Sequence, residues 1–390
     1  MSKKILSIML SLVMVMSLLT GCGEKDSTFF KEVKEMSKIS TGEATVEMNM
    51  SGTVDENDGV PAQLLDADGK LSVGMKMDLK QESKTKIAMK FALKLGTASD
   101  YQDVTTIAVD DSKVYVDVAP LIAFVKTIDE EAATSAEATL SQIGVTDSLS
   151  IDYKQVIEAM GSEVPEAQEL DKETLEKVNS IFDKVENDFK DLQGKDGDDY
   201  TLSVNGDNAE KAVDAMAAFF ENDCEEILTI CVDVVKQAYG EDSEFASMYD
   251  ELLGDTSSLK ETAQQLKDSK EDIVSEIKES KINIVAKART TGDEGSRNGK
   301  LSLETGDMTF EEDGVSQSAN ISFSATIKEG TPSIADMIPE NAADITTLVI
   351  TMINAQMEGA PAIDGGIIGG GDDATDMQID DLGVDDLEIE

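Results

Sequence analysis

Three cysteines supply the side chains of this sequence best suited to covalent chemistry, and their surroundings differ sharply. Cys22 lies where an uncharged run of fifteen residues, Ile5 to Leu19, gives way to charged residues in the stretch MSLLTGCGEK. Two lysines, Lys3 and Lys4, precede that run. A basic start followed by a run of this length is typical of a secretory signal peptide, and the run is shorter than the ~20 residues that span a bilayer. We therefore expect the chain to be exported.

The four residues Leu19, Thr20, Gly21 and Cys22 resemble the lipobox of bacterial lipoproteins. In that family the cysteine thiol takes a diacylglyceryl group, and the leader is cleaved immediately before the cysteine. The resemblance implies that residues 1–21 are removed, that Cys22 becomes a lipidated N-terminus with acyl chains such as palmitate, and that residues 22–28 form a linker. Two acyl chains anchor a protein firmly, because each buried methylene adds ~0.8 kcal/mol.

The location implied by the lipobox is the cell membrane, with the protein held on its surface outside the cytoplasm. An ordinary signal peptide with an incidental cysteine is the alternative.

The other two cysteines, Cys224 and Cys231, fall in one helical pattern, seven residues apart. That spacing corresponds to about 10.5 Å of helix rise, whereas a disulfide needs Cα atoms within about 7 Å. A zinc or redox pair would require a C-x-x-C motif or nearby histidines, and the chain contains no histidine. We therefore interpret both as core thiols and expect no metal site and no cofactor.

The charge balance is strongly acidic. Without residues 1–21 the chain keeps 31 basic and 80 acidic residues, a net charge of −49. Such a chain repels nucleic acid and anionic lipid headgroups, so nucleic-acid binding is excluded. The expected partners are the membrane, through the anchor, and a hydrophobic ligand; the sequence identifies no protein partner.

Sequence signatures of enzymes are missing. The chain has no G-x-S-x-G elbow, P-loop or H-E-x-x-H motif, and histidine, the commonest general base, does not occur. A carboxylate pair of the glycosidase type is conceivable among 80 acids, but sugar clefts usually offer aromatic platforms, and the chain has no Trp and six Tyr. The motif DADGK at 66–70 lacks the glycine offset and closing glutamate of an EF-hand, so we interpret it as a turn. We expect a protein without enzymatic activity.

Apolar residues alternate with polar ones from residue 43 onward. The clearest runs are ATVEMNM (44–50), LSVGMKMDLK (71–80) and KIAMKFALKL (86–95). Similar strands are expected at 103–109, 113–118, 199–204, 281–290, 298–305 and 318–328. A period of two predicts strands of an antiparallel sheet with one buried face.

Between these strands the period changes to that of amphipathic helices. Asp171 can cap a helix with an apolar stripe from Leu175 to Leu192, and Asn208 opens a stretch with one apolar face up to Ala238. Further helices are expected at 29–39, 258–280 and 342–357.

These elements predict a body at residues 29–358 of the α+β class. We expect strands at about 43–118, a mainly helical region at 119–280 with a strand near 199–204, and strands again at 281–328. The predicted architecture is a curved, one-sided antiparallel sheet of about 8–9 strands, with a long helical insertion packed on its apolar face. Residues 359–390 hold seven glycines and ten acids with no base, a composition typical of disorder.

The order of elements resembles the lipoprotein-carrier fold of bacterial envelopes and the related lipid-binding lipoproteins. That resemblance implies an incompletely closed sheet that cups helices around a hydrophobic cavity, with a site for an acyl chain. The candidate cavity face is Met48, Met50, Met75, Met77, Met89 and Phe91. Methionine is flexible and suits varied apolar ligands, but such a stripe is more often plain core, and the sequence favours that reading.

The sequence therefore predicts a membrane-anchored, exported, non-enzymatic lipoprotein that binds a lipid or other hydrophobic ligand between sheet and helices. One alternative is a structural or protein-interaction lipoprotein of the cell surface with a filled core. Another is the solute-binding component of a transporter, although those folds alternate strands and helices in parallel βαβ units.

Overall fold

The computed structural model describes residues 28–54, 60–161, 171–239, 257–312 and 315–359. The predicted leader, the lipobox with Cys22, most of the linker and nearly all of the acidic tail lie outside these ranges. Within them the chain forms ten α-helices and thirteen strands, so the predicted α+β class is confirmed.

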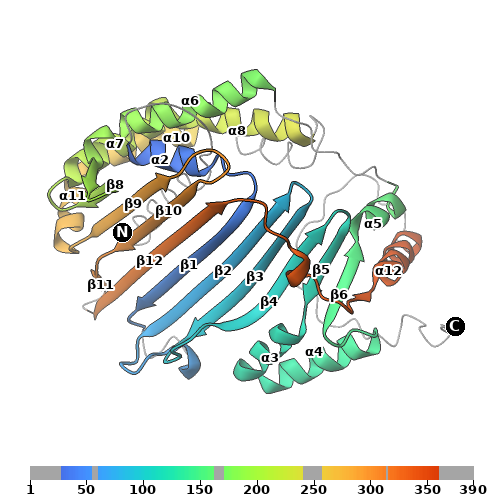
Figure 1. Ribbon diagram of the computed structural model, residues 1–390. Helices are drawn as coiled ribbons and strands as arrows, with labels where there is room; N and C mark the ends of the chain where they lie inside the picture. The colour runs from blue at the N-terminus through green and yellow to red at the C-terminus, as the bar shows by residue number, and fades with distance from the viewer. Residues whose placement is uncertain (1–27, 55–59, 162–170, 240–256, 313–314, 360–390) are drawn as a thin grey trace.

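One open sheet contains all thirteen strands (Figure 1). Its order is β13-β6-β5-β4-β3-β2-β1-β12-β10-β9-β8-β7, and β11 pairs with β12. Every pair is antiparallel except β13 with β6. The strands are β1 (Gly42–Gly52), β2 (Leu71–Ser83), β3 (Lys86–Leu95), β4 (Gln102–Asp110), β5 (Lys113–Asp117), β6 (Ser148–Asp152), β7 (Gln193–Asp196), β8 (Asp199–Asn205), β9 (Asn283–Thr291), β10 (Asn298–Thr305), β11 (Met308–Glu312), β12 (Val315–Glu329) and β13 (Ala343–Asp344).

The predicted count of 8–9 strands is wrong. All nine predicted strands are present, but β6, β7, β11 and β13 were missed. Each of these four has two to five residues, too few to show an alternating pattern. Two of them, β6 and β7, lie in the region predicted to be mainly helical, and β13 occupies the start of the helix predicted at 342–357.

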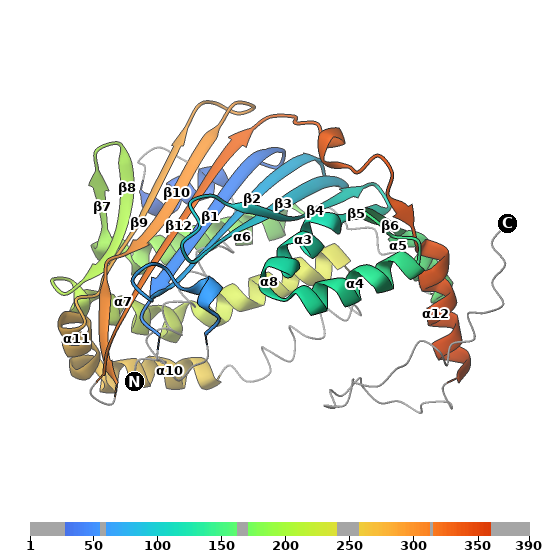
Figure 2. The ribbon, with the colours of Figure 1, turned by 90° about the horizontal axis from the view of Figure 1, so that it is seen from below.

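The helices gather beneath the arched sheet and at its ends (Figure 2). They are α2 (Phe29–Met36), α3 (Ala119–Ile128), α4 (Glu130–Gln142), α5 (Tyr153–Ala159), α6 (Lys172–Asp188), α7 (Ala209–Asn222), α8 (Cys224–Tyr239), α10 (Ser257–Asp268), α11 (Lys270–Glu279) and α12 (Thr346–Gly359). Asp171 caps α6 as predicted, its carboxylate accepting from the Thr174 amide at 2.7 Å. The single apolar helix face expected from Asn208 to Ala238 is instead divided between α7 and α8, because α7 ends at Asn222 and α8 begins at Cys224.

The main core lies where α2, α6, α7 and α11 meet strands β8 to β10. Helix α2 is central to it, with Phe29 and Phe30 almost completely buried. Its close approach to β10 depends on Gly299, because a Cβ there would lie 2.7 Å from Met36 Sδ. The Glu32 carbonyl also accepts from Thr290 Oγ1 at 2.9 Å, which ties the helix to β9.

The opposite face of the sheet is crossed by residues 330–345, which we call the strap. Ile334 in the strap is buried against Ala88 and Ala108 of β3 and β4. Lys80 Nζ lies 2.8 Å from Asp336 Oδ2, and the Ile334 amide donates to Glu82 Oε2 at 3.2 Å. The strap therefore leads the chain from β12 across six strands, β1 to β6, to β13 and α12. No helix within the described residues is long and apolar enough to cross a membrane.

Candidate functional site

The sheet register brings together all six residues of the predicted apolar face. Met48 of β1 lies opposite Met75 of β2, and Met77 lies opposite Phe91 of β3. Leu79 pairs with Met89 on the same face. We call Met48, Met50, Met75, Met77, Met89 and Phe91 the methionine face.

The methionine face is open to solvent. Met48, Met50 and Met75 are 38%, 36% and 38% exposed, and Met77, Met89 and Phe91 are half-buried. The same side of the sheet is buried at β8 to β10, where Leu202, Ala286 and Leu303 form part of the main core. The predicted packing of helices on the apolar face thus holds at β8–β10 but not at β1–β3.

Charge is absent from this side of six neighbouring strands. On β1 to β6 every residue that shares the methionine side is uncharged, and the charged side chains alternate onto the other side. Helix α3 lies beneath the same part of the sheet (Figure 2), with Phe124 buried, while Leu121 and Ile128 on the same helical stripe are 36% and 43% exposed. Several large apolar side chains exposed on one side of a sheet are typical of a binding site for an apolar partner.

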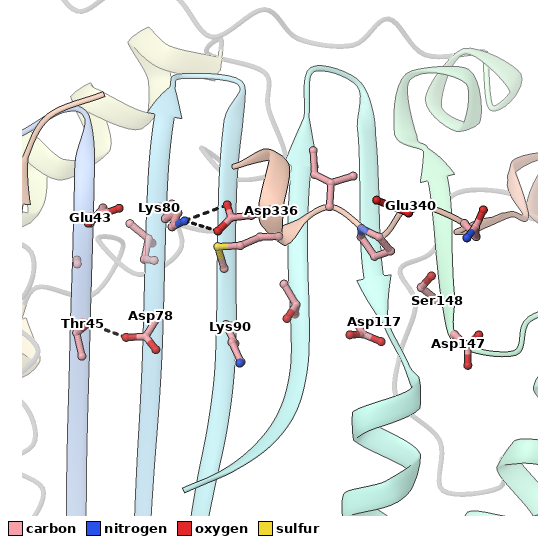
Figure 3. Close-up of a pocket in the computed structure, with 17 residues that line it drawn as sticks. Glu43, Thr45, Asp78, Lys80, Lys90, Asp117, Asp147, Ser148, Asp336 and Glu340 are labelled. Atoms are coloured by element: carbon pink, nitrogen blue, oxygen red, sulfur yellow. Dashed lines mark hydrogen bonds and ion pairs between the residues drawn. The ribbon is translucent and has the colours of Figure 1, made fainter. Parts of the chain in front are cut away.

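A polar pocket of about 720 Å³ lies on the other side of the sheet, between the strands and the strap (Figure 3). Its lining includes six carboxylates and two lysines. They are Glu43, Asp78, Asp117, Asp147, Asp336, Glu340, Lys80 and Lys90.

Both lysines of this polar pocket are already paired with carboxylates. The hydrogen bond from Lys80 holds the pKa of Asp336 below its ordinary value, and the hydroxyl of Thr45 donates to Asp78 at 2.6 Å. Lys90 Nζ lies 2.8 Å from Asp103. Burial raises the pKa of Asp117, with a smaller contribution from the nearby charge of Asp147. The Lys80–Asp336 pair fastens the strap to the sheet, and the two ion pairs together account for the pocket's lysines without a ligand.

Both cysteines of α8 are free thiols, as predicted. Burial raises the pKa of the Cys224 thiol to about 11, and Cys231 shifts in the same direction. Both groups are therefore protonated and unreactive at neutral pH. The described part of the chain also holds no cluster of three or more His, Cys, Asp or Glu side chains arranged to bind a metal ion.

One half-buried carboxyl lies outside both the methionine face and the polar pocket. Asp188 is the last residue of α6, and its Oδ2 atom is buried without a hydrogen-bond partner in the described structure. Burial and the neighbouring Asp223 carboxylate raise the pKa of Asp188 to about 7, while Lys184 and Lys190 act in the opposite direction. Lys184 Nζ lies 3.7 Å from Asp223.

This carboxyl predicts a pH-dependent stability. Because the folded protein holds the Asp188 proton more tightly than the unfolded chain, stability is expected to fall as the pH rises from 3.8 to about 7, and to be fully reduced above that value. At pH 8 the Asp188→Asn variant should gain about 1 kcal/mol in the free energy of unfolding, after allowance for solvent screening. Urea unfolding at pH 5 and pH 8 measures the difference. The exposed neighbour Asp191→Asn serves as control, and an equal pH response in wild type and Asp188→Asn would refute the assignment.

No family model, curated protein or solved structure matches the chain. The site must therefore be interpreted from its own residues. Sequence patterns found the methionine face, but they missed the strap, the polar pocket and the Asp188–Asp223 pair. Each of these joins residues that are far apart along the chain, and no local pattern marks them.

Proposed function

We propose that this protein is an exported lipoprotein, anchored to the membrane through Cys22, whose methionine face binds the acyl chains of a lipid without catalysing a reaction. The observation that carries the ligand-binding proposal is the exposure of Met48, Met50 and Met75 in the middle of a folded sheet. The lipobox carries the proposal of an anchor. A curved, open sheet with helices beneath it is also consistent with the resemblance to lipoprotein carriers (Figure 2).

Physical chemistry favours an occupant for the methionine face. Apolar surface gains roughly 25 cal/mol for each Å² removed from water, so a bound acyl chain would be stabilised along its length. Methionine side chains can adapt to chains of different length and saturation because they are unbranched and polarizable. The absence of charge on this side of β1–β6 means that a hydrocarbon bound there would desolvate no charged side chain.

The two alternatives fit the structure less well. A structural lipoprotein with a filled core would bury the methionine face, whereas three of its six side chains are more than a third exposed. A solute-binding component of a transporter would be built on parallel strands, whereas β13–β6 is the one parallel pair among the described strands.

A single introduced tryptophan tests the proposed site, because the natural chain contains none. Met75→Trp places the reporter on the methionine face, where 38% exposure leaves room for it. We expect a phosphatidylcholine with brominated acyl chains to quench its fluorescence in a saturable manner, since bromine quenches only at close range.

The matched control is Met352→Trp on α12, where the methionine is 48% exposed but lies outside the sheet. Its fluorescence should stay unchanged at the same lipid concentrations. Equal quenching of both reporters, or of neither, would contradict binding at the methionine face.

A further inference from the structure

The methionine face exceeds what one acyl chain can cover. In the register of β2 its members reach from Val73 to Leu79, six steps or about 20 Å at ~3.3 Å per residue, and β1 and β3 widen the face by ~4.8 Å on each side. One acyl chain is about 15 Å long, half the ~30 Å hydrocarbon core of a bilayer. The dimensions therefore suit a lipid with two chains better than a single-chain fatty acid.

Helices α3 and α4, beside this face, carry more acidic than basic residues. Helices α3 and α4 together carry one lysine, Lys126, and the stretch 129–137 carries four exposed carboxylates. These acids are Asp129, Glu130, Glu131 and Glu137. Recognition of a phosphate or carboxylate normally uses arginine or lysine, often in pairs.

The lysines that reach α8 are already paired with its carboxylates. Lys177 Nζ lies 3.7 Å from Asp233, and Lys260 Nζ lies 3.5 Å from Glu225. Lys184 bridges Glu226 and Asp223. At the β13 end of the sheet, α12 carries no basic residue. Because the whole chain has a net charge of −47, we expect a negative electrostatic potential at this surface.

We infer that the ligand of the methionine face is a two-chain lipid whose headgroup carries no net negative charge. The inference rests on the proposed function and adds the class of lipid. Like-charge repulsion from the acids of α4 disfavours an anionic headgroup, while a zwitterionic or cationic headgroup meets no such repulsion. The apolar face then supplies affinity, and the charged surroundings supply selectivity.

Competition within one membrane tests this selectivity. The chain from residue 22 onward, carrying Cys22→Ser, is incubated with vesicles of equimolar phosphatidylcholine and phosphatidylglycerol. The vesicles are then removed by centrifugation, and the lipid retained by the protein is identified by mass spectrometry. Because both lipids come from the same vesicle surface, repulsion between protein and vesicle cannot bias the ratio. We expect at least fivefold more phosphatidylcholine than phosphatidylglycerol on the protein. A ratio near one, or an excess of phosphatidylglycerol, overturns the inference but leaves the proposed function standing, whereas retention of neither lipid overturns the proposed function itself.

A charge reversal tests the cause. Glu131→Lys/Glu137→Lys on α4 should lower the ratio of phosphatidylcholine to phosphatidylglycerol severalfold. The control Asp293→Lys/Glu294→Lys makes the same change in net charge at exposed positions of the β9–β10 hairpin, and its ratio should match that of the unmodified chain. An unchanged ratio in the α4 variant, or equal shifts in both variants, would refute the role assigned to the acids of α4.

Discussion

The Cys22→Ser variant is expected to incorporate no labelled palmitate in cells, whereas the natural chain is labelled. The reason is that serine lacks the thiol that would form the thioether to diacylglycerol. Since each buried methylene contributes ~0.8 kcal/mol, loss of two chains removes the whole of the proposed anchor. No helix of the described residues can replace it by crossing the membrane.

The controls for this first prediction are the remaining cysteines. Cys224 is buried and Cys231 is half-buried in α8, so the Cys224→Ser and Cys231→Ser variants should be labelled like the natural chain. Labelling that persists in Cys22→Ser would refute the lipobox assignment. Loss of labelling in an α8 variant that still folds would point to a different acylated residue.

The second prediction concerns the methionine face. Met48→Asp/Met75→Asp is expected to weaken binding of a phosphatidylcholine with a fluorescent acyl chain at least a hundredfold, about 2.7 kcal/mol. A carboxylate covered by hydrocarbon loses its hydration without gaining a partner, at a cost of several kcal/mol. Both methionines are more than a third exposed, so the variant should stay folded, but the two carboxylates lie directly opposite each other and should lower the free energy of unfolding by about 1–2 kcal/mol. Fluorescence titration and urea unfolding measure the two quantities.

A matched variant separates position from charge. Met160→Asp/Met352→Asp adds the same two carboxylates at methionines that are 53% and 48% exposed but lie outside the sheet. Its affinity for the fluorescent lipid should stay within about twofold of the natural chain, since distant exposed charges are screened. If both double variants lost binding equally, net charge would explain the loss and the methionine face would not be the site.

The long strands were predictable because apolar and polar residues alternate over most of their length. The shorter β5 was predictable because it forms a hairpin with β4. The runs around Met48, Met75 and Met89 predicted strands and the face that these residues share. The cap of α6 at Asp171 was predictable for the same reason, since its signal lies within four residues.

What could not be predicted depends on distance along the chain. Strand β13 has two residues and exists only because the strap returns to β6, almost 200 residues away. The exposure of the methionine face could not be predicted either, because alternating apolar and polar residues give the same sequence pattern whether or not a helix covers the apolar side. The number of apolar helices suggested full coverage, but their packing is concentrated at β8 to β10.

The most direct measurement is the lipid that the protein itself carries. The mature chain with Cys22→Ser, exported behind a leader without a lipobox and purified without detergent, should yield a stoichiometric two-chain lipid by mass spectrometry, and the Met48→Asp/Met75→Asp variant should yield none. Natural and variant proteins that are both free of lipid, together with no binding of added phosphatidylcholine, would contradict the proposal that the open apolar face is a lipid site.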